Sequence, residues 1–194
     1  MVMTLDELRT ALEAVPGHDW LRDAEAGIRV EPGRVFARAD RKLGREPLPG
    51  APGWTAGQAA RAVLLAALDD PDQILLLYHH GDAAERLAVL RALPLLPIGD
   101  AAVPLLHDAL RTNDPRLVAT ALGPYAAHLD AATWRDGVIK CVFMGVPLDA
   151  VADLDRRADG ELAAMLAALA AERRAAGRAM PADAAALLER TGEQ

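Results

Sequence analysis

Charged side chains that could do chemistry gather in the C-terminal third of the chain. Asp149, Asp153 and Asp155 lie close together, and Arg156 follows them directly. Aspartates four residues apart share one face of a helix, where they could bind a divalent cation or work as an acid and base pair. A solvated cap between two short helices is the simpler interpretation. We therefore expect no metal site here.

Arginines further along the chain suggest a second kind of chemistry. A helix that is apolar up to Leu169 continues its apolar stripe to Arg173, so the guanidinium is expected to point inward. A buried guanidinium needs an acidic partner, for which Asp155 is a candidate. Structural ion pairing is the favoured interpretation. The alternative is that Arg156, Arg173 and Arg178 together bind an anionic ligand.

Lys140 lies in an apolar segment, Val138–Phe143. An ammonium group that is desolvated there would have a lowered pKa, which suits Schiff-base or general-base chemistry. We favour a simpler arrangement, in which the stem of Lys140 packs on the protein and its ammonium group reaches water. The neighbouring Cys141, the only cysteine, is expected to be a small core residue.

Strong catalytic and cofactor motifs are missing from the sequence. It has no Walker A loop, no G-x-G-x-x-G, no H-E-x-x-H and no C-x-x-C, and the absence of serine excludes a serine nucleophile. His79 and His80 are adjacent, which places them about 100° apart on a helix, and they precede Gly81. That position suits donors near a helix C-terminus better than metal ligands. We expect no cofactor.

Capping signals predict that these residues are positioned by helices. Helices are expected to begin after Thr4, Thr55, Asp70, Asp82 and Asp114, which are residue types that cap helix N-termini. The chain contains 42 alanines and is poor in aromatic residues, which favours helix over strand. Residues 44–54, rich in proline and glycine, are predicted to form an extended loop. The fold class is therefore predicted to be all-α.

Two architectures agree with this pattern. Asp70-Pro71 and Asp114-Pro115 lie 44 residues apart, and each opens a pair of helices. That interval is typical of HEAT-like helical repeats, which would give a short α-solenoid. A compact irregular helical bundle would show the same stripes. In either case we expect residues 1–194 to form a single domain.

Charge and hydropathy exclude several classes of protein. The formal net charge is −7 and no basic tract is present, which argues against nucleic-acid binding. The longest apolar run, residues 162–171, has ten residues where a membrane span needs about 20. The first residues reach an acid too soon for a signal peptide. We expect a cytoplasmic protein without a membrane span.

The order of short segments across residues 20–188 resembles EboA-domain proteins. The segments are Gly53-Trp54-Thr55, Gln58-Ala59-Ala60-Arg61, Leu93-Pro94-Leu95-Leu96-Pro97, Arg111-Thr112-Asn113, Pro124-Tyr125-Ala126, Trp134, Val138-Ile139-Lys140 with Phe143, Pro147-Leu148, Leu154-Asp155-Arg156-Arg157-Ala158, Glu172-Arg173 and Ala175-Ala176-Gly177-Arg178. The chain departs from the family pattern at Ala171, where a histidine is expected, and at Asp159, where an asparagine is expected.

This resemblance implies a role beside a UbiA-type prenyltransferase and other enzymes of a cluster that makes or exports a secondary metabolite. One hypothesis is a non-catalytic helical adaptor or ligand carrier, whose partners are these enzymes or a small-molecule intermediate. The other is a small enzyme that acts on an anionic or cyclitol-like intermediate. Its pocket would be formed by charged and polar side chains that converge in the fold: Arg111, Asn113, Lys140, Asp155, Arg156 and Arg173.

Overall fold

A computed structural model describes residues 3–192, and every regular element in this range is a helix. The only pairing of β type in the described residues is an isolated bridge between Pro47 and Thr55. The all-α prediction is confirmed. Whether the helices repeat in a HEAT-like manner stays a prediction. The chain divides into two compact units, Met1–Leu105 and Leu106–Gln194, called here the N-terminal and C-terminal units. That they act as one domain also stays a prediction.

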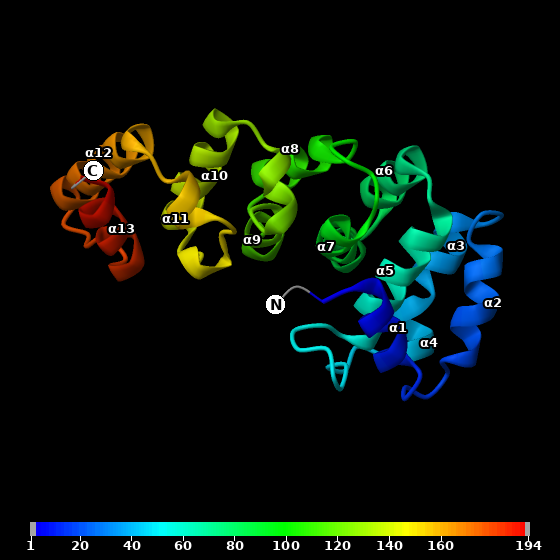
Figure 1. Ribbon diagram of the computed structural model, residues 1–194. Coiled ribbons are helices and arrows are strands. Elements are labelled where there is room, and N and C mark those ends of the chain that lie inside the picture. The colour runs from blue at the N-terminus through cyan, green and yellow to red at the C-terminus, as the bar shows by residue number, and fades with distance from the viewer. Residues whose placement is uncertain (1–2, 193–194) are drawn as a thin grey trace. The chain divides into compact units, whose positions relative to one another are not determined.

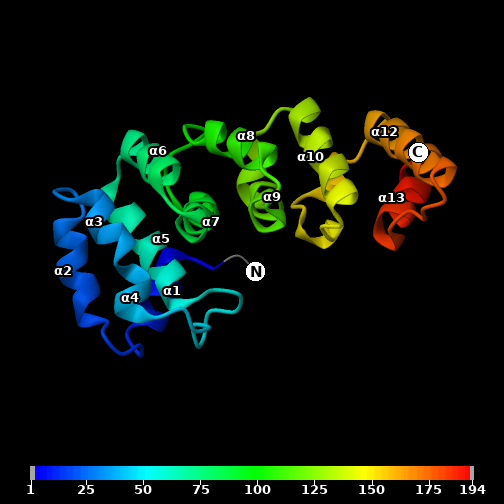
Figure 2. The ribbon, with the colours of Figure 1, turned by 180° about the vertical axis from the view of Figure 1, so that it is seen from behind.

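The N-terminal unit is built around one central helix. Its elements are α1 (Leu5–Leu12), α2 (Asp19–Gly27), α3 (Pro32–Ala37), α4 (Ala39–Leu43), α5 (Ala56–Leu68), α6 (Pro71–His80), α7 (Ala83–Ala92) and the 3-10 helix η1 (Leu93–Leu95). Figure 1 and, from behind, Figure 2 show α5 among the other helices of this unit, and α1, α2, α4 and α7 all pack against it.

The sequence of α5 explains its central place. A capping box between Thr55 and Gln58 starts the helix, and Asp69 in the left-handed conformation (φ 50°) ends it. Nearly every residue between is buried, on all sides of the helix and not only along one stripe. An alanine-rich helix with so little polar surface is stable only where neighbours cover it completely.

Arg61 is the exception to the apolar surface of α5. Its side chain is 3% exposed, its Nη1 donates to Asp40 Oδ1 at 2.5 Å, and its Nε donates to the carbonyl of Phe36 at 3.3 Å. Gly57, one helical turn earlier, provides the space for Asp40, because a Cβ at residue 57 would overlap Asp40 Oδ1. The pair joins α5 to α4.

The C-terminal unit is a succession of short helices. Its elements are α8 (Val103–Arg111), in whose first turn the division between the units falls, α9 (Pro115–Ala121), η2 (Pro124–His128), α10 (Ala131–Met144), η3 (Leu148–Ala150), α11 (Leu154–Arg157), α12 (Gly160–Ala175) and α13 (Ala182–Gly192). Within this unit α10 packs against α9, and α12 lies beside α13 in both ribbon views (Figures 1 and 2).

Trp134 is the centre of the core around α10. Its side chain is 1% exposed, and the guanidinium carbon of Arg157 lies 4.6 Å from the ring centroid. Arg157 also donates to the carbonyls of Ala126 and Leu129, at 2.6 and 2.9 Å. Burial lowers the pKa of Arg157 from its ordinary value. Arg157 therefore links α11 to η2 by hydrogen bonds and to α10 by its contact with the ring of Trp134.

The predicted helix starts are confirmed. Thr4, Thr55 and Asp82 form complete capping boxes, and the side chains of Asp70 and Asp114 accept hydrogen bonds from backbone amides of the helices that they open. Residues 44–54 form an irregular segment, as predicted. These features were predictable because a cap depends only on residues within about one turn of the helix start.

Candidate functional site

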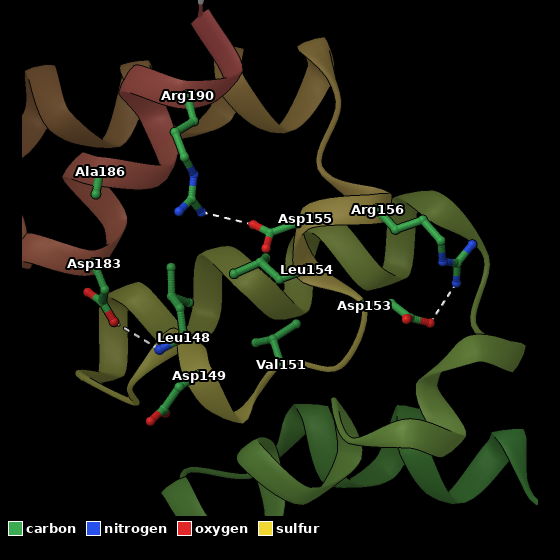
Figure 3. Close-up of a pocket in the computed structure, with 10 residues that line it drawn as sticks. All are labelled: Leu148, Asp149, Val151, Asp153, Leu154, Asp155, Arg156, Asp183, Ala186 and Arg190. Carbon is green, nitrogen blue, oxygen red and sulfur yellow. Dashed lines mark hydrogen bonds and ion pairs between the residues drawn. The ribbon is translucent and has the colours of Figure 1, made fainter. Parts of the chain in front are cut away.

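A cavity of about 560 Å³ opens on the C-terminal unit between the segment from η3 to α11 and the helix α13. The residues that line it are Leu148, Asp149, Val151, Asp153, Leu154, Asp155, Arg156, Asp183, Ala186 and Arg190 (Figure 3). Its volume is in the range of sites for small molecules. We call it the C-terminal pocket.

The C-terminal pocket combines apolar and charged surface. Leu148 and Val151 are buried, at 3% and 6% exposure, and Leu154 is half-buried. The other lining residues are four aspartates, two arginines and Ala186. A site of this composition offers an apolar contact area together with several hydrogen-bond donors and acceptors.

The charged side chains pair with each other around the pocket. Arg156 Nη2 lies 2.6 Å from Asp153 Oδ2, and Arg190 Nη2 lies 3.0 Å from Asp155 Oδ1 (Figure 3). The bond from Arg156 lowers the pKa of Asp153 below its usual value. Since the side chains of Arg190 and Asp155 are 58% and 84% exposed, their pair contributes no more than about 1 kcal/mol. A polar ligand can therefore replace it at little cost.

One carboxylate fixes the shape of the pocket. Asp183, near the start of α13, accepts a hydrogen bond from the backbone amide of Leu148 at 2.9 Å, as Figure 3 shows. That amide begins η3 and has no partner within its own short helix. Asp183 thus ties α13 to η3 at one end of the pocket, while Arg190 and Asp155 join α13 to α11.

Only two of the seven predicted site residues, Asp155 and Arg156, line this pocket. Arg111 is 75% exposed on α8 and bonds to Asp108 in its own helix. Asn113 and Arg178 are exposed, while Lys140 is half-buried on α10. None of these four, nor Arg173, is among the residues that line the pocket.

The expectation of a buried pair between Arg173 and Asp155 is wrong. Asp155 pairs with Arg190, and Arg173 is only half-buried, with its Nε donating to the backbone carbonyl of Ala179 at 3.0 Å. The apolar stripe of α12 does not extend to residue 173, because the buried positions of this helix are Leu162 and Leu166. The final turns of α12 lie beyond the packed part of the core.

The arginine and aspartate that complete the pocket, Arg190 and Asp183, were missed by sequence reasoning. Both lie on α13, and each is 35 residues after the residue that it contacts. A weak local signal exists for Asp183, because an acid in the first turn of a helix is favoured by the helix dipole. This signal predicts that Asp183 lies at the start of a helix, but it does not predict a pocket.

The predicted core position of Cys141 is confirmed, since its side chain is fully buried. Burial raises the pKa of the thiol to about 11. At pH 8 the folded protein should therefore react with a disulfide reagent such as DTNB far more slowly than the protein unfolded in urea. Absorbance at 412 nm measures this rate. Full labelling of the folded protein within seconds would contradict the burial.

Within residues 3–192, no three His, Cys, Asp or Glu side chains are grouped as ligands of a metal ion would be. The helices of this range are also too short or too polar for any of them to cross a lipid bilayer.

Comparison with known proteins identifies the family. No curated protein and no solved structure is significantly similar to the chain. The family described as metabolite traffic protein EboA matches residues 39–189, which include the Arg61–Asp40 pair and every residue that lines the C-terminal pocket except Arg190. Because the match covers most of the sequence, the chain belongs to the EboA family of metabolite traffic proteins.

Proposed function

We propose that the protein is a non-catalytic carrier that holds a small metabolite in the C-terminal pocket. The observation that supports this most directly is the pairing of exposed charges around an apolar floor. These side chains can bind a polar molecule by exchanging the hydrogen bonds that they make with each other for hydrogen bonds to the molecule. The family description, which names metabolite traffic, fits a protein that binds and releases a molecule without changing it.

The chemistry of the pocket describes its ligand. Leu148 and Val151 provide the apolar contact, so part of the ligand is apolar. Four aspartates and two arginines also line the pocket, so the rest of the ligand carries hydroxyl or charged groups that both donate and accept hydrogen bonds. The enzymes of a secondary-metabolite cluster, including a UbiA-type prenyltransferase, are the proposed partners that load and unload it in the cytoplasm.

The first test is whether the protein retains a small molecule. The full chain is purified from cells that carry the cluster and is measured by native mass spectrometry. We expect a mass excess that disappears on denaturation. In Ala186→Trp the excess should be lost, because the indole fills the pocket from an exposed position on α13.

Ala168→Trp is the matched control. Residue 168 is also an exposed helical alanine, on α12 and outside the pocket, so this variant should retain the molecule. An empty wild-type protein, or retention by Ala186→Trp equal to that of Ala168→Trp, would contradict the proposal. Incubation of the isolated complex followed by chemical analysis tests the enzyme alternative, which requires conversion of the bound molecule.

A further inference from the structure

A second cavity, of about 310 Å³, lies within the N-terminal unit between α3, α6 and the start of α7. The residues that line it are Pro32, Gly33, Phe36, Ala37, Gln73, Leu76, Leu77, His80, Gly81 and Glu85. We call it the N-terminal pocket. It shares no residue with the C-terminal pocket.

The spacing of residues on α6 explains the composition of this pocket. Gln73, Leu77 and His80 are related by four and three residues, so they share one face of the helix. From α3, Phe36 contributes a ring that is 1% exposed, and Leu76 remains 45% exposed. The cavity is therefore mainly apolar, with polar groups supplied by Gln73, His80 and Glu85.

Glu85 is the only charged residue among those that line the cavity, and its side chain is 15% exposed. Its Oε2 accepts a hydrogen bond of 2.9 Å from the backbone N–H of Asp82, which is part of the capping box of α7. Its Oε1 lies 3.9 Å from Arg61 Nη2, which is too far for a hydrogen bond. Within residues 3–192, Oε1 thus has a nearby charge but no hydrogen-bond donor.

Glu85 is less closely paired with a cation than Asp40 is. Arg61 donates from its Nη1 to Asp40 and from its Nε to the carbonyl of Phe36. Its Nη2 is the group nearest to Glu85, so one buried guanidinium lies beside two carboxylates. Asp40 has a second cationic partner, because the exposed Arg45 donates its Nε to Asp40 Oδ2 at 2.8 Å, whereas among residues 3–192 Glu85 has only Arg61, at 3.9 Å. A carboxylate in an apolar surrounding is stabilised by a matched cation that also donates hydrogen bonds.

We propose that the N-terminal pocket binds a small organic cation. Its ammonium group bonds to Glu85 Oε1, and its apolar part packs on Phe36 and Leu77. The cation donates to Oε1 the hydrogen bond that no residue within 3–192 donates, and it lies closer to this carboxylate than Arg61 does. The site is independent of the metabolite pocket proposed above, because all of its residues lie in the N-terminal unit.

Two glycines in the wall make the site testable. Gly33 lines the cavity and is exposed, and a Cβ there would meet no atom within 4 Å, so this position accepts a larger side chain without a clash. A Cβ on Gly81 would lie 2.9 Å from Glu85 Cβ, so Gly81 is needed for the packing of Glu85 itself. Gly33→Leu is therefore the variant that blocks the cavity without displacing its carboxylate.

The probe is benzylammonium, titrated into the full-length protein labelled with nitrogen-15 and followed by NMR. We expect saturable shifts of amides in α3, α6 and α7. Benzyl alcohol, which keeps the ring but lacks the charge, should bind about tenfold more weakly or worse. Glu85→Gln keeps the capping acceptor but loses the charge, and it should weaken benzylammonium binding by a similar factor.

Gly33→Leu should abolish the shifts, whereas Gly160→Leu should not change them. Residue 160 is the matched control, because a Cβ there also meets no atom within 4 Å but lies in the C-terminal unit. Equal binding of benzylammonium by wild type and Glu85→Gln, equal binding of the two probes, or shifts confined to other helices would each overturn the proposal. Ala186→Trp should bind benzylammonium normally, which separates this test from that of the carrier function.

Discussion

Replacing Arg61 by methionine should lower the free energy of unfolding of the N-terminal unit by about 3–5 kcal/mol. The variant removes the guanidinium that lies 2.5 Å from Asp40 and 3.9 Å from Glu85, whose side chains are only 11% and 15% exposed. Two buried carboxylates are then left without their shared cation. Hydrogen exchange of the amides of α5, measured by mass spectrometry, reports the loss locally.

Two further variants separate electrostatics from packing. Arg41→Met changes an exposed arginine on the adjacent helix α4 and should alter stability by about 0.5 kcal/mol at most. In the Arg61→Met background Asp40 keeps only the exposed Arg45 as a cationic partner within the described part of the chain, so adding Asp40→Asn should recover part of the loss. A loss below about 1 kcal/mol in Arg61→Met would show that water or other groups solvate both carboxylates.

The structure shows why sequence reasoning chose the wrong arginine as the buried one. The prediction that Arg173 is buried assumes that the apolar face of α12 continues to its last turns. The buried residues of this helix end before those turns. Arg61 stands in a run of alanine, valine and leucine, which was a signal for a buried charge. Its partner Asp40 lies on another helix, and periodicity within one helix carries no information about such a neighbour.

The same limit applies to the C-terminal pocket. Asp155 and Arg156 could be selected because acids and arginines are concentrated in one short segment of sequence. Asp183 and Arg190 become pocket residues only when α13 packs beside that segment, which depends on tertiary structure. Helix starts and the core position of Cys141 on α10 were predictable, since both are set by residues within a few turns.

Trp134→Ala should be the most damaging substitution in the C-terminal unit, with an expected loss of about 3–5 kcal/mol. The side chain is 1% exposed, and its removal leaves a large cavity in the core around α10. It also removes the ring on which Arg157 stacks, and that arginine holds the carbonyls of Ala126 and Leu129. Hydrogen exchange in α10 and urea unfolding followed by circular dichroism measure the effect.

Trp134→Phe is the informative companion variant. In the part of the chain that the structure describes, the indole Nε1 of Trp134 has no hydrogen-bond partner. The substitution by phenylalanine therefore removes no hydrogen bond. The smaller ring still fills much of the space and still presents a face to Arg157. Its loss should therefore be less than half of that in Trp134→Ala. Equal losses in the two variants would contradict the view that the volume of the ring stabilises this core.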